Sequence, residues 1–298
     1  MPTDEDDEIE IIETPPGILE HKRAVMLATV FPVIYTDETY YDYQGSAFQL
    51  FDLECGQMVF ATAKHILEPL YEEWTRDAFV LMPHLDGNLP SRTHTAQLKI
   101  NGVWASKNNN DIALIRCDRR SVDDVPLARS ITTLKIAPPV AGDVTIALGF
   151  TGHMHIEPDK FKRVFRISHG IVRELHHGGA GTNPLVNSPM FQTSGRYDPG
   201  MSGGPVLDQN GNCIGIVAHG MSEQEGVESV GFATSIACLG ELAIDLEMDD
   251  GTTKNFKVPE LTGGLILLSD DGPAVTLVHD ENGLHLEWSS ADQPEVES

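Results

Sequence analysis

The sequence predicts an all-β protein, and three observations support this prediction. Short apolar or alternating stretches recur from residue 24 onward, the pattern of strands whose successive side chains face opposite ways. Turn-forming segments such as Leu85-Asp86-Gly87-Asn88 separate these stretches. Only Thr234–Met248 repeats its apolar residues at helical spacing. Many short strands joined by loops favour a barrel or a sandwich over alternating β-strands and α-helices.

The candidate strands form two series, which are divided at Pro138-Pro139. The length of 298 residues suits one large domain or two smaller ones. The first series comprises Ala24–Tyr35, Gly45–Phe51, Met58–Ala63, Ala78–Met82, Ala96–Val103 and Asp111–Cys117. The second comprises Asp143–Gly149, Phe161–Arg173, Gly204–Leu207, Cys213–Ala218 and Ser229–Ala233.

A helix and a small acidic extension are predicted after the second series. Apolar residues recur at spacings of three and four in Thr234–Met248, which is typical of an amphipathic helix, and Asp249-Asp250-Gly251 ends it. Residues 249–298 are expected to form a β-rich extension that covers an edge of the second half and has a disordered end. Its three candidate strands are Leu265–Leu268, Ala274–Val278 and Leu284–Trp288.

The formal net charge of −25 argues against a nucleic acid or any other polyphosphate as a partner. The acidic excess is concentrated at the two ends of the chain. Residues 1–20 contain eight acidic and no basic residues, and residues 241–298 contain fourteen acidic against two basic. We expect residues 1–20 to be a disordered acidic arm. No apolar run approaches the roughly 20 residues of a membrane span, so no membrane partner is expected.

Cysteine usage and the acidic start of the chain predict a cytoplasmic protein with reduced thiols. The four cysteines, Cys55, Cys117, Cys213 and Cys238, show no close pairing and no metal-type spacing. A secretory signal would begin with positive charge and an apolar run, the reverse of what is found here. Five histidines invite a metal interpretation: His153, His155, His169, His176 and His177. They lack carboxylate or cysteine partners at ligand spacing, so no metal site is predicted.

The segment Asp198-Pro199-Gly200-Met201-Ser202-Gly203-Gly204-Pro205 carries the strongest chemical signal. Glycines before and after one serine indicate unusual backbone angles or close approach to a ligand. A nucleophilic serine in acyl transfer needs neighbouring N–H groups directed at the developing oxyanion. The backbone amides of Gly200 and Ser202 are the N–H groups expected to donate to the oxyanion. Taken alone, the segment could also be a glycine-rich turn between strands.

The same residues satisfy the G-x-S-x-G pattern of the α/β-hydrolase nucleophile elbow, which we reject. That motif requires a helix directly after the serine, with the acid and the histidine downstream. Here Pro205, the turn Asp208-Gln209-Asn210-Gly211-Asn212 and a candidate strand follow Ser202. Partners for the serine are therefore sought upstream.

Two upstream segments offer a histidine and an aspartate at strand ends. His65 follows the apolar stretch Val59–Ala63, and Asp111 opens the stretch Ile112–Ile115. Each residue on its own is more typical of a structural position at the end of a strand. Their flanks, together with the serine segment, carry a more specific pattern.

These segments resemble the trypsin-like (chymotrypsin-fold) serine peptidases, whose motifs are T-A-x-H, D-[IL]-A-[VL]-[LI] and G-x-S-G-G-P. In this chain they read Thr62-Ala63-Lys64-His65, Asp111-Ile112-Ala113-Leu114-Ile115 and Gly200–Pro205. The resemblance covers roughly residues 24–245, extends to Gly215–Gly220 and Gly231–Thr234, and looks most like the HtrA/DegP-type branch.

The resemblance implies a fold of two antiparallel six-stranded β-barrels. The barrels would span about residues 24–125 and 130–248, within a peptidase domain of residues 21–248. An active cleft would lie between them, with His65 and Asp111 from the first barrel and Ser202 from the second.

The resemblance also implies serine endopeptidase activity through a catalytic triad. His65 would take the proton of Ser202 and later give it to the leaving amine, and Asp111 would hold the imidazole in one tautomer. The Gly200 and Ser202 amides would form the oxyanion hole. The substrate is a protein or peptide, and no cofactor is implied because the serine–histidine pair needs none.

Substrate binding is carried over to six residues in the same way. The edge formed by Ala218, His219 and Gly220 would pair with the extended substrate backbone. Arg196 and Tyr197 would lie at the floor of the pocket for P1, the substrate residue whose carbonyl is attacked. Gly220 and Gly231 lack side chains and would leave the walls of this pocket open. An arginine buried there would favour an acidic P1 side chain, whereas one pointing into water would not.

Two residues depart from the family pattern. Met201 stands where secreted members carry an aspartate that pairs with a newly cut N-terminal amine, so we expect no activation of that type. Ala218 replaces a serine or threonine that supports the aspartate in many relatives. A non-catalytic peptide-binding member of the fold and an esterase that uses the same triad are the alternatives to an endopeptidase.

Overall fold

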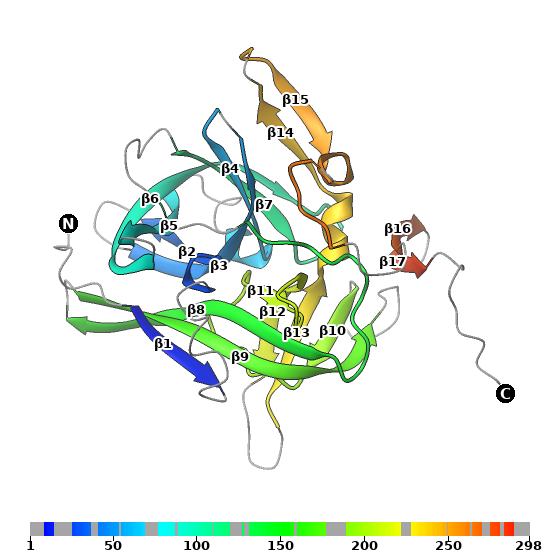
Figure 1. Cartoon of the computed structure of the whole chain (residues 1–298), viewed down its shortest axis with the longest axis horizontal. Helices are drawn as coiled ribbons and strands as arrows, with labels where there is room; N and C mark the ends of the chain where they lie inside the picture. The colour runs from blue at the N-terminus through cyan, green and yellow to red at the C-terminus, as the bar shows by residue number, and fades with distance from the viewer. Residues whose placement is uncertain are drawn as a thin grey trace.

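Two closed β-barrels form the body of the protein, as the computed structural model shows (Figure 1). The structure describes residues 9–14, 26–36, 41–53, 55–68, 77–86, 89–108, 110–119, 127, 131–157, 160–176, 189–221, 228–248, 250–262, 264–269, 275–280 and 283–288. None of the helices in these ranges has the length and hydropathy that a membrane crossing requires.

The first barrel closes in the strand order β2-β3-β4-β7-β6-β5, with antiparallel neighbours. The strands are β2 (Val30–Thr36), β3 (Tyr41–Asp52), β4 (Gln57–Thr62), β5 (Asp77–Asp86), β6 (Leu89–Ala105) and β7 (Ala113–Asp118). Every residue of β4 is buried. Phe60 of this strand meets Phe31 of β2 edge to face, with ring centroids 5.8 Å apart. The barrel interior is therefore filled by side chains.

The second barrel also has six strands, in the order β9-β10-β13-β12-β11-β8, and the pairing of β8 with β9 closes it. The strands are β8 (Val144–Glu157), β9 (Lys160–His176), β10 (Met190–Thr193), β11 (Pro205–Leu207), β12 (Cys213–Met221) and β13 (Val230–Ser235). The two six-stranded barrels that the resemblance implies are confirmed. Strand β10 was absent from the sequence prediction, because its four residues show too short a pattern to separate from the loops beside them.

The N-terminal prediction was wrong for residues 9–14. Instead of a disordered arm, Ile9–Thr14 forms strand β1, which pairs in parallel with Arg163–Ser168 of β9 (Figure 1). The Glu13 carboxylate is fully buried and lies 2.9 Å from Nε2 of His169. Pairing of this buried charge lets an acidic segment dock on the barrel. The other residues of the expected arm, 1–8 and 15–20, lie outside the described ranges.

The predicted amphipathic helix in Thr234–Met248 was also wrong. After β13 comes a short 3-10 helix, η5 (Ile236–Glu241), and then strand β14 (Ala243–Glu247). Leu246 lies at a helical spacing of three from Ala243 and also, with buried Ile244, at the period of two of a strand, which explains the error. The turn that contains Gly251, at φ 77°, joins β14 to β15 (Thr253–Lys257) rather than ending a helix.

The hairpin β14-β15 lies against the first barrel, not over an edge of the second as expected (Figure 1). The Gln57 side-chain amide donates to the Glu247 carbonyl at 2.7 Å, and the Arg116 guanidinium donates to the Asp245 carbonyl at 3.0 Å. Helix η6 (Val258–Leu261) follows the hairpin. The chain thus returns from the second barrel to the first.

Further along the extension, two of three predicted strands are present. Strands β16 (Val275–Asp280) and β17 (Gly283–Trp288) form an antiparallel hairpin at the predicted places. Leu265–Leu268 makes only isolated bridges, from Ile266 to Thr262 and from Leu268 to Leu134. The last ten residues, 289–298, lie outside the described ranges.

We predict that Phe60→Ala lowers the free energy of unfolding by about 3–5 kcal/mol, because it removes a fully buried ring and its contact with Phe31. Urea titration followed by tryptophan fluorescence measures the change. Phe60→Leu, which keeps most of the volume, should cost clearly less. A loss below about 1 kcal/mol for Phe60→Ala would show that this contact does not stabilise the barrel.

Candidate active site

His65 leaves the first barrel where β4 ends, at the first residue of the 3-10 helix η3 (His65–Leu67). The next two residues, Ile66 and Leu67, are buried and hold this turn on the barrel. The Tyr35 hydroxyl donates to the Ile66 carbonyl at 2.6 Å. The His65 side chain is in contrast 42% exposed, so the strand end presents an imidazole at the surface while its neighbours anchor it.

Asp111 contacts His65 at two points. Its Oδ2 lies 2.7 Å from Nδ1 of His65, and its Oδ1 accepts the His65 backbone N–H at 2.9 Å. Because a carboxylate only accepts, Nδ1 carries the proton in the neutral imidazole, and the lone pair is on Nε2. The sequence-predicted pair is therefore brought together in the tautomer that a general base requires.

The loop that carries Asp111 is held from two sides. Side-chain amides of Asn108 and Asn110 donate to the two carboxylate oxygens of Glu241, at 2.6 and 2.8 Å. From the other side, the Lys64 ammonium donates to the Ser106 carbonyl at 2.8 Å. Glu241 ends η5, at the end of the second barrel. Sequence reasoning missed Glu241, and no local motif marks it, because its partners lie more than 130 positions away.

Ser202 lies on a turn of the second barrel that docks on β3 of the first. The Ser46 N–H donates to the Ser202 carbonyl at 2.8 Å. Gly203 adopts φ 87°, and a Cβ there would overlap the Ser46 carbonyl. Gly45 has Ser202 O on one side and the Ile66 side chain on the other, each within 3.0 Å of an added Cβ. These close approaches explain the glycines and place the serine turn beside the residue that follows His65.

The Ser202 hydroxyl donates to the Ala218 carbonyl at 3.0 Å. Within the part of the chain that the structure describes, no hydrogen bond joins it to His65. Ala218 is the extra residue of a bulge in β12, between Val217 and His219, and bulges commonly redirect the backbone beside active sites. The serine turn and the His65 turn thus share one region, with the hydroxyl bonded to Ala218 rather than to the imidazole.

Two backbone amides beside the serine are available as donors. Between them, the Met201 N–H donates to the Asp198 carbonyl at 3.1 Å. The amides of Gly200 and Ser202 have no acceptor among the described residues. On the opposite side of the turn, the Gly200 carbonyl accepts from the Tyr43 hydroxyl at 2.9 Å and from Ser46 Oγ at 3.2 Å. The turn therefore exposes two N–H groups as an oxyanion hole would.

Tyr43 and Ser46 are two further residues that the sequence analysis did not single out. The Tyr43 hydroxyl also donates to the Phe150 carbonyl at 2.8 Å, and Ser46 Oγ accepts the Phe150 N–H at 2.9 Å. Burial raises the pKa of Tyr43 far above its usual value, so the phenol stays a donor. No local signal marks them, because β3 also carries the polar residues Asp42, Gln44, Gln49 and Asp52.

A buried methionine and a paired aspartate stabilise the serine turn from within. Met201 is fully buried, and its Sδ accepts the Asp198 N–H at 3.4 Å. The Asp198 carboxylate lies between two guanidinium groups, 2.8 Å from Arg166 and 2.7 Å from Arg196. Met201, buried and bonded through its thioether to the Asp198 N–H, thus takes the position that the family pattern gives to an aspartate.

Strand β12 offers an open edge beside the serine. It pairs with β11 only as far as Ile216, and with β13 through Met221. Ala218, His219 and Gly220 therefore lack a strand partner on one side within the described ranges. An extended peptide could add there as a further strand. This edge is where the sequence analysis expected the substrate backbone.

The expected P1 pocket is not open. The Tyr197 ring is 3% exposed and packs on Gly231, whose added Cβ would lie 2.6 Å from Cε2 of the ring. Gly220, the register partner of Gly231, faces the Tyr197 backbone and Cβ. Arg196 is half exposed and bound to Asp198. The expectation of open glycine walls with an arginine at the floor is therefore corrected.

The two histidines of the site have opposite pKa shifts. Burial lowers the pKa of His65, but the hydrogen bond and charge of Asp111 and the charge of Glu68 outweigh it, so the pKa is raised. Burial lowers the pKa of His219, the charge of His65 adds to this, and Asp111 opposes it. His219 stacks on Phe232 with centroids 4.6 Å apart, and its buried Nε2 has no partner among the described residues.

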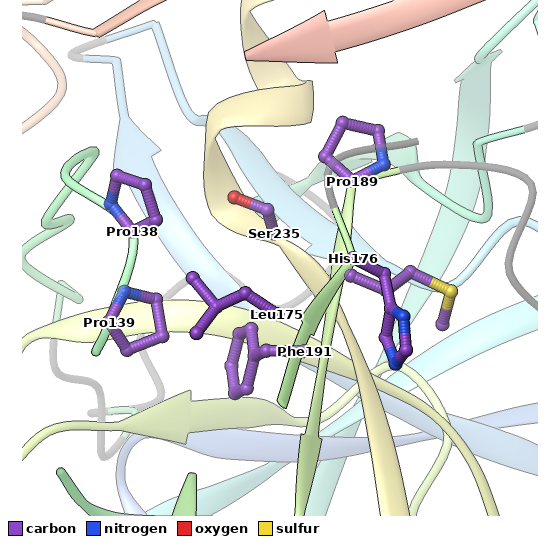
Figure 2. A pocket seen from close by; sticks show the side chains of 8 residues that line it. Pro138, Pro139, Leu175, His176, Pro189, Phe191 and Ser235 are labelled. Carbon is purple, nitrogen blue, oxygen red and sulfur yellow. The ribbon is translucent and has the colours of Figure 1, made fainter. Parts of the chain in front are cut away.

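An apolar pocket lies on the second barrel, and it is lined by none of the predicted triad or substrate-binding residues. Leu175 and Phe191 lie between the two prolines Pro138 and Pro139 on one side and His176 on the other (Figure 2). Among the described residues, no three His, Cys, Asp or Glu side chains gather as a metal site would require. Nothing ties this pocket to the triad.

Residues 50–216 match the family described as trypsin-like peptidase domain. The match spans more than half of the chain and includes all three predicted triad residues. This chain belongs to the trypsin-like peptidase family. No curated protein matches the sequence of this peptidase domain.

The fold of the peptidase domain is similar to that of HtrA/Deg-type proteases. Deg5 is 18% identical, with a TM-score of 0.51 over 75% of this chain and 93% of Deg5. The HtrA-type protease AlgW with decapeptide is 17% identical, with a TM-score of 0.48 over 86% of this chain and 81% of AlgW. The active form of the Rv3671c protease from M. tuberculosis is 16% identical, with a TM-score of 0.47 over 76% and 85%.

We predict that His65 of this peptidase domain titrates above 6.5 and His219 below it, measured from imidazole proton shifts in NMR. Asp111→Asn should lower the pKa of His65, because the carboxylate's hydrogen bond and charge are lost while burial remains. Asp250→Asn, an exposed control that contacts Thr252, should leave it unchanged. A wild-type His65 pKa at or below 6.5 would contradict the assignment of Asp111 as its partner.

Proposed function

We propose that this trypsin-like peptidase is a serine endopeptidase that acts through Ser202, His65 and Asp111. The observation that carries the proposal is the two-point contact of Asp111 with His65. This contact fixes the imidazole so that Nε2 can take a proton. The unpaired amides of Gly200 and Ser202 supply the second requirement, a place for negative charge next to the serine.

The reaction follows from these positions. Ser202 Oγ attacks the substrate carbonyl carbon and passes its proton to His65 Nε2, while the carbonyl oxygen becomes an oxyanion at the two amides. The C–N bond then breaks, and His65 returns the proton to the leaving amine. Water then attacks the resulting ester and gives a proton to His65, which passes it to Ser202 Oγ as the ester C–O bond breaks and the acid product leaves.

The hydrogen bond from Ser202 to Ala218 gives substrate binding a role in activation. A substrate strand that adds to the open edge of β12 brings a backbone N–H to the Ala218 carbonyl. That N–H competes with the serine hydroxyl, which then turns to His65. Apo enzymes commonly have catalytic hydrogen bonds that form fully only in the complex.

A peptide-binding protein without catalysis is the second candidate, and the Ser202–Ala218 hydrogen bond is the observation that favours it. In that case the chain binds peptides along β12 but forms no acyl-enzyme. An esterase with the same triad would form the acyl-enzyme and hydrolyse small esters, yet leave peptides intact. Side-by-side ester and peptide assays separate these three activities.

We predict that a fluorophosphonate probe labels the wild-type protein at Ser202 and that Ser202→Ala is not labelled. Peptide hydrolysis by Ser202→Ala should fall by about 10⁶-fold, because the nucleophile is lost. Thr262→Ala, which removes an exposed hydroxyl bonded only to Pro259, is the matched control and should behave as wild type. Peptide binding without labelling of the wild type would exclude the endopeptidase in favour of the binding protein.

We also predict that Glu241 acts as a positioning residue for Asp111. Glu241→Gln leaves one carbonyl oxygen for two asparagine donors, so the Asp111 loop loses a charge-assisted hydrogen bond. We expect kcat to fall about tenfold with KM unchanged, and the pKa of His65 to move toward 6.5.

The matched control for this variant is Glu260→Gln, since Glu260 is exposed and accepts from the Lys257 amide at the start of η6. Kinetics and NMR titration are recorded for both variants. If Glu241→Gln lowers thermal stability but leaves both kcat and the pKa of His65 as in wild type, its role is structural only.

A cytoplasmic location is likewise our proposal. All four cysteines are free, with Cys117, Cys213 and Cys238 buried, which is in keeping with a reducing compartment. Cell fractionation with antibody detection tests it, and recovery of the protein in an exported fraction would contradict it.

A further inference from the structure

Given the proposed function, on which this inference rests, the positions of the catalytic groups define the space for the P1 side chain of a substrate. The attacked carbonyl must lie at the amides of Gly200 and Ser202, with the substrate backbone along β12. The P1 side chain is then directed between residues 195–199 and the paired glycines of β12 and β13, Gly220 and Gly231. In an open pocket this space would be empty.

The Tyr197 ring fills that space. Gly231 borders one edge of the ring, where an added Cβ would lie 2.6 Å from Cε2 and 2.7 Å from Cδ2. Gly195 borders the other edge, where an added Cβ would lie 3.2 Å from Cε1. The ring therefore lies in a slot lined by glycines: a Cβ at Gly231 would collide with it, and one at Gly195 would be in tight contact with it.

The ring is anchored at its far end. The Tyr197 hydroxyl accepts from Thr193 Oγ1 of β10 at 3.2 Å, and the same Oγ1 accepts the Gly195 N–H at 3.1 Å. The ring also belongs to a buried apolar cluster with Val172, Phe191, Val217 and Ala233, among others. Moving the ring aside would break this hydrogen bond and expose apolar surface to water, and both changes are unfavourable.

We infer that Tyr197 occupies the P1 side-chain pocket and restricts this peptidase to cleavage after glycine or alanine. A larger P1 side chain would have to enter the volume of the ring. Arg196, which the sequence analysis placed at the pocket floor, takes no part in this selection, because its guanidinium is bound to Asp198 and half exposed.

The test compares P1 profiles of wild type, Tyr197→Val and Tyr197→Phe in a peptide library whose members differ only at P1. Wild type should cleave after alanine about 100-fold faster, in kcat/KM, than after leucine. Tyr197→Val should accept leucine and phenylalanine, because the ring is gone. Tyr197→Phe, which keeps the ring and loses only the hydroxyl, should keep the alanine preference. A wild type that cleaves equally well after leucine overturns the inference.

A second measurement makes the inference independent of turnover and of the stability of Tyr197→Val. The Ser202→Ala protein, with Tyr197 intact, is titrated calorimetrically with peptides that carry alanine or leucine at P1. Tighter binding of the alanine peptide supports the inference, and equal or reversed affinities overturn it. Fluorophosphonate labelling of wild type reports separately on the proposed function. Labelling together with leucine cleavage would leave the peptidase standing and remove only the restriction by Tyr197.

Discussion

The site depends on one docking contact between the barrels, that of the serine turn with β3. Ser202 comes from the second barrel, whereas His65 follows β4, the neighbour of β3 in the first. The Ser46 N–H bonded to the Ser202 carbonyl, and the Tyr43 and Ser46 hydroxyls bonded to the Gly200 carbonyl, fix the turn against that strand. Because these bonds are part of a buried network, each unmade bond would leave a buried polar group unsatisfied. The relative position of nucleophile and base is thereby coupled to folding of both barrels.

The segment that leads from the second barrel back to the first also constrains the site, because it contacts the loop of Asp111. Helix η5 leaves the second barrel and places Glu241 on the loop of Asp111, and β14 then lies on the first barrel through Gln57 and Arg116. The segment thus connects the barrel that carries the serine with the loop that carries the aspartate. Ala218 cannot bond Asp111 through a side-chain hydroxyl, as a serine or threonine there could. The hydrogen bonds from Asn108 and Asn110 to the Glu241 carboxylate support the loop of Asp111 instead.

Sequence patterns predicted the parts of this structure that local chemistry determines. His65, Asp111 and Ser202 were singled out because each lies in a short specific motif, and the structure brings the first two into contact. Short strands and turns predicted an all-β fold, and the family resemblance implied its two barrels. The errors fall where one pattern fits two structures. Leu246 fits a helical spacing from Ala243 and, with Ile244, a strand period, and an acidic N-terminal segment still forms a strand once Glu13 pairs with His169. Glu241 was out of reach because its partners are distant in sequence.

The pocket illustrates the same ambiguity at the level of a single site. Glycines at positions 220 and 231 are required whether a substrate side chain or the protein's own tyrosine lies between them, since both occupants need a wall without Cβ atoms. The sequence therefore predicts a slot but not its occupant. Three features decide the occupant in the folded chain: Gly195 borders the opposite edge of the ring, Thr193 holds the hydroxyl, and Arg196 is held outside by Asp198. These contacts depend on the three-dimensional arrangement of β10, β12 and β13. The P1 preference is therefore a property of the fold that the catalytic motifs do not contain.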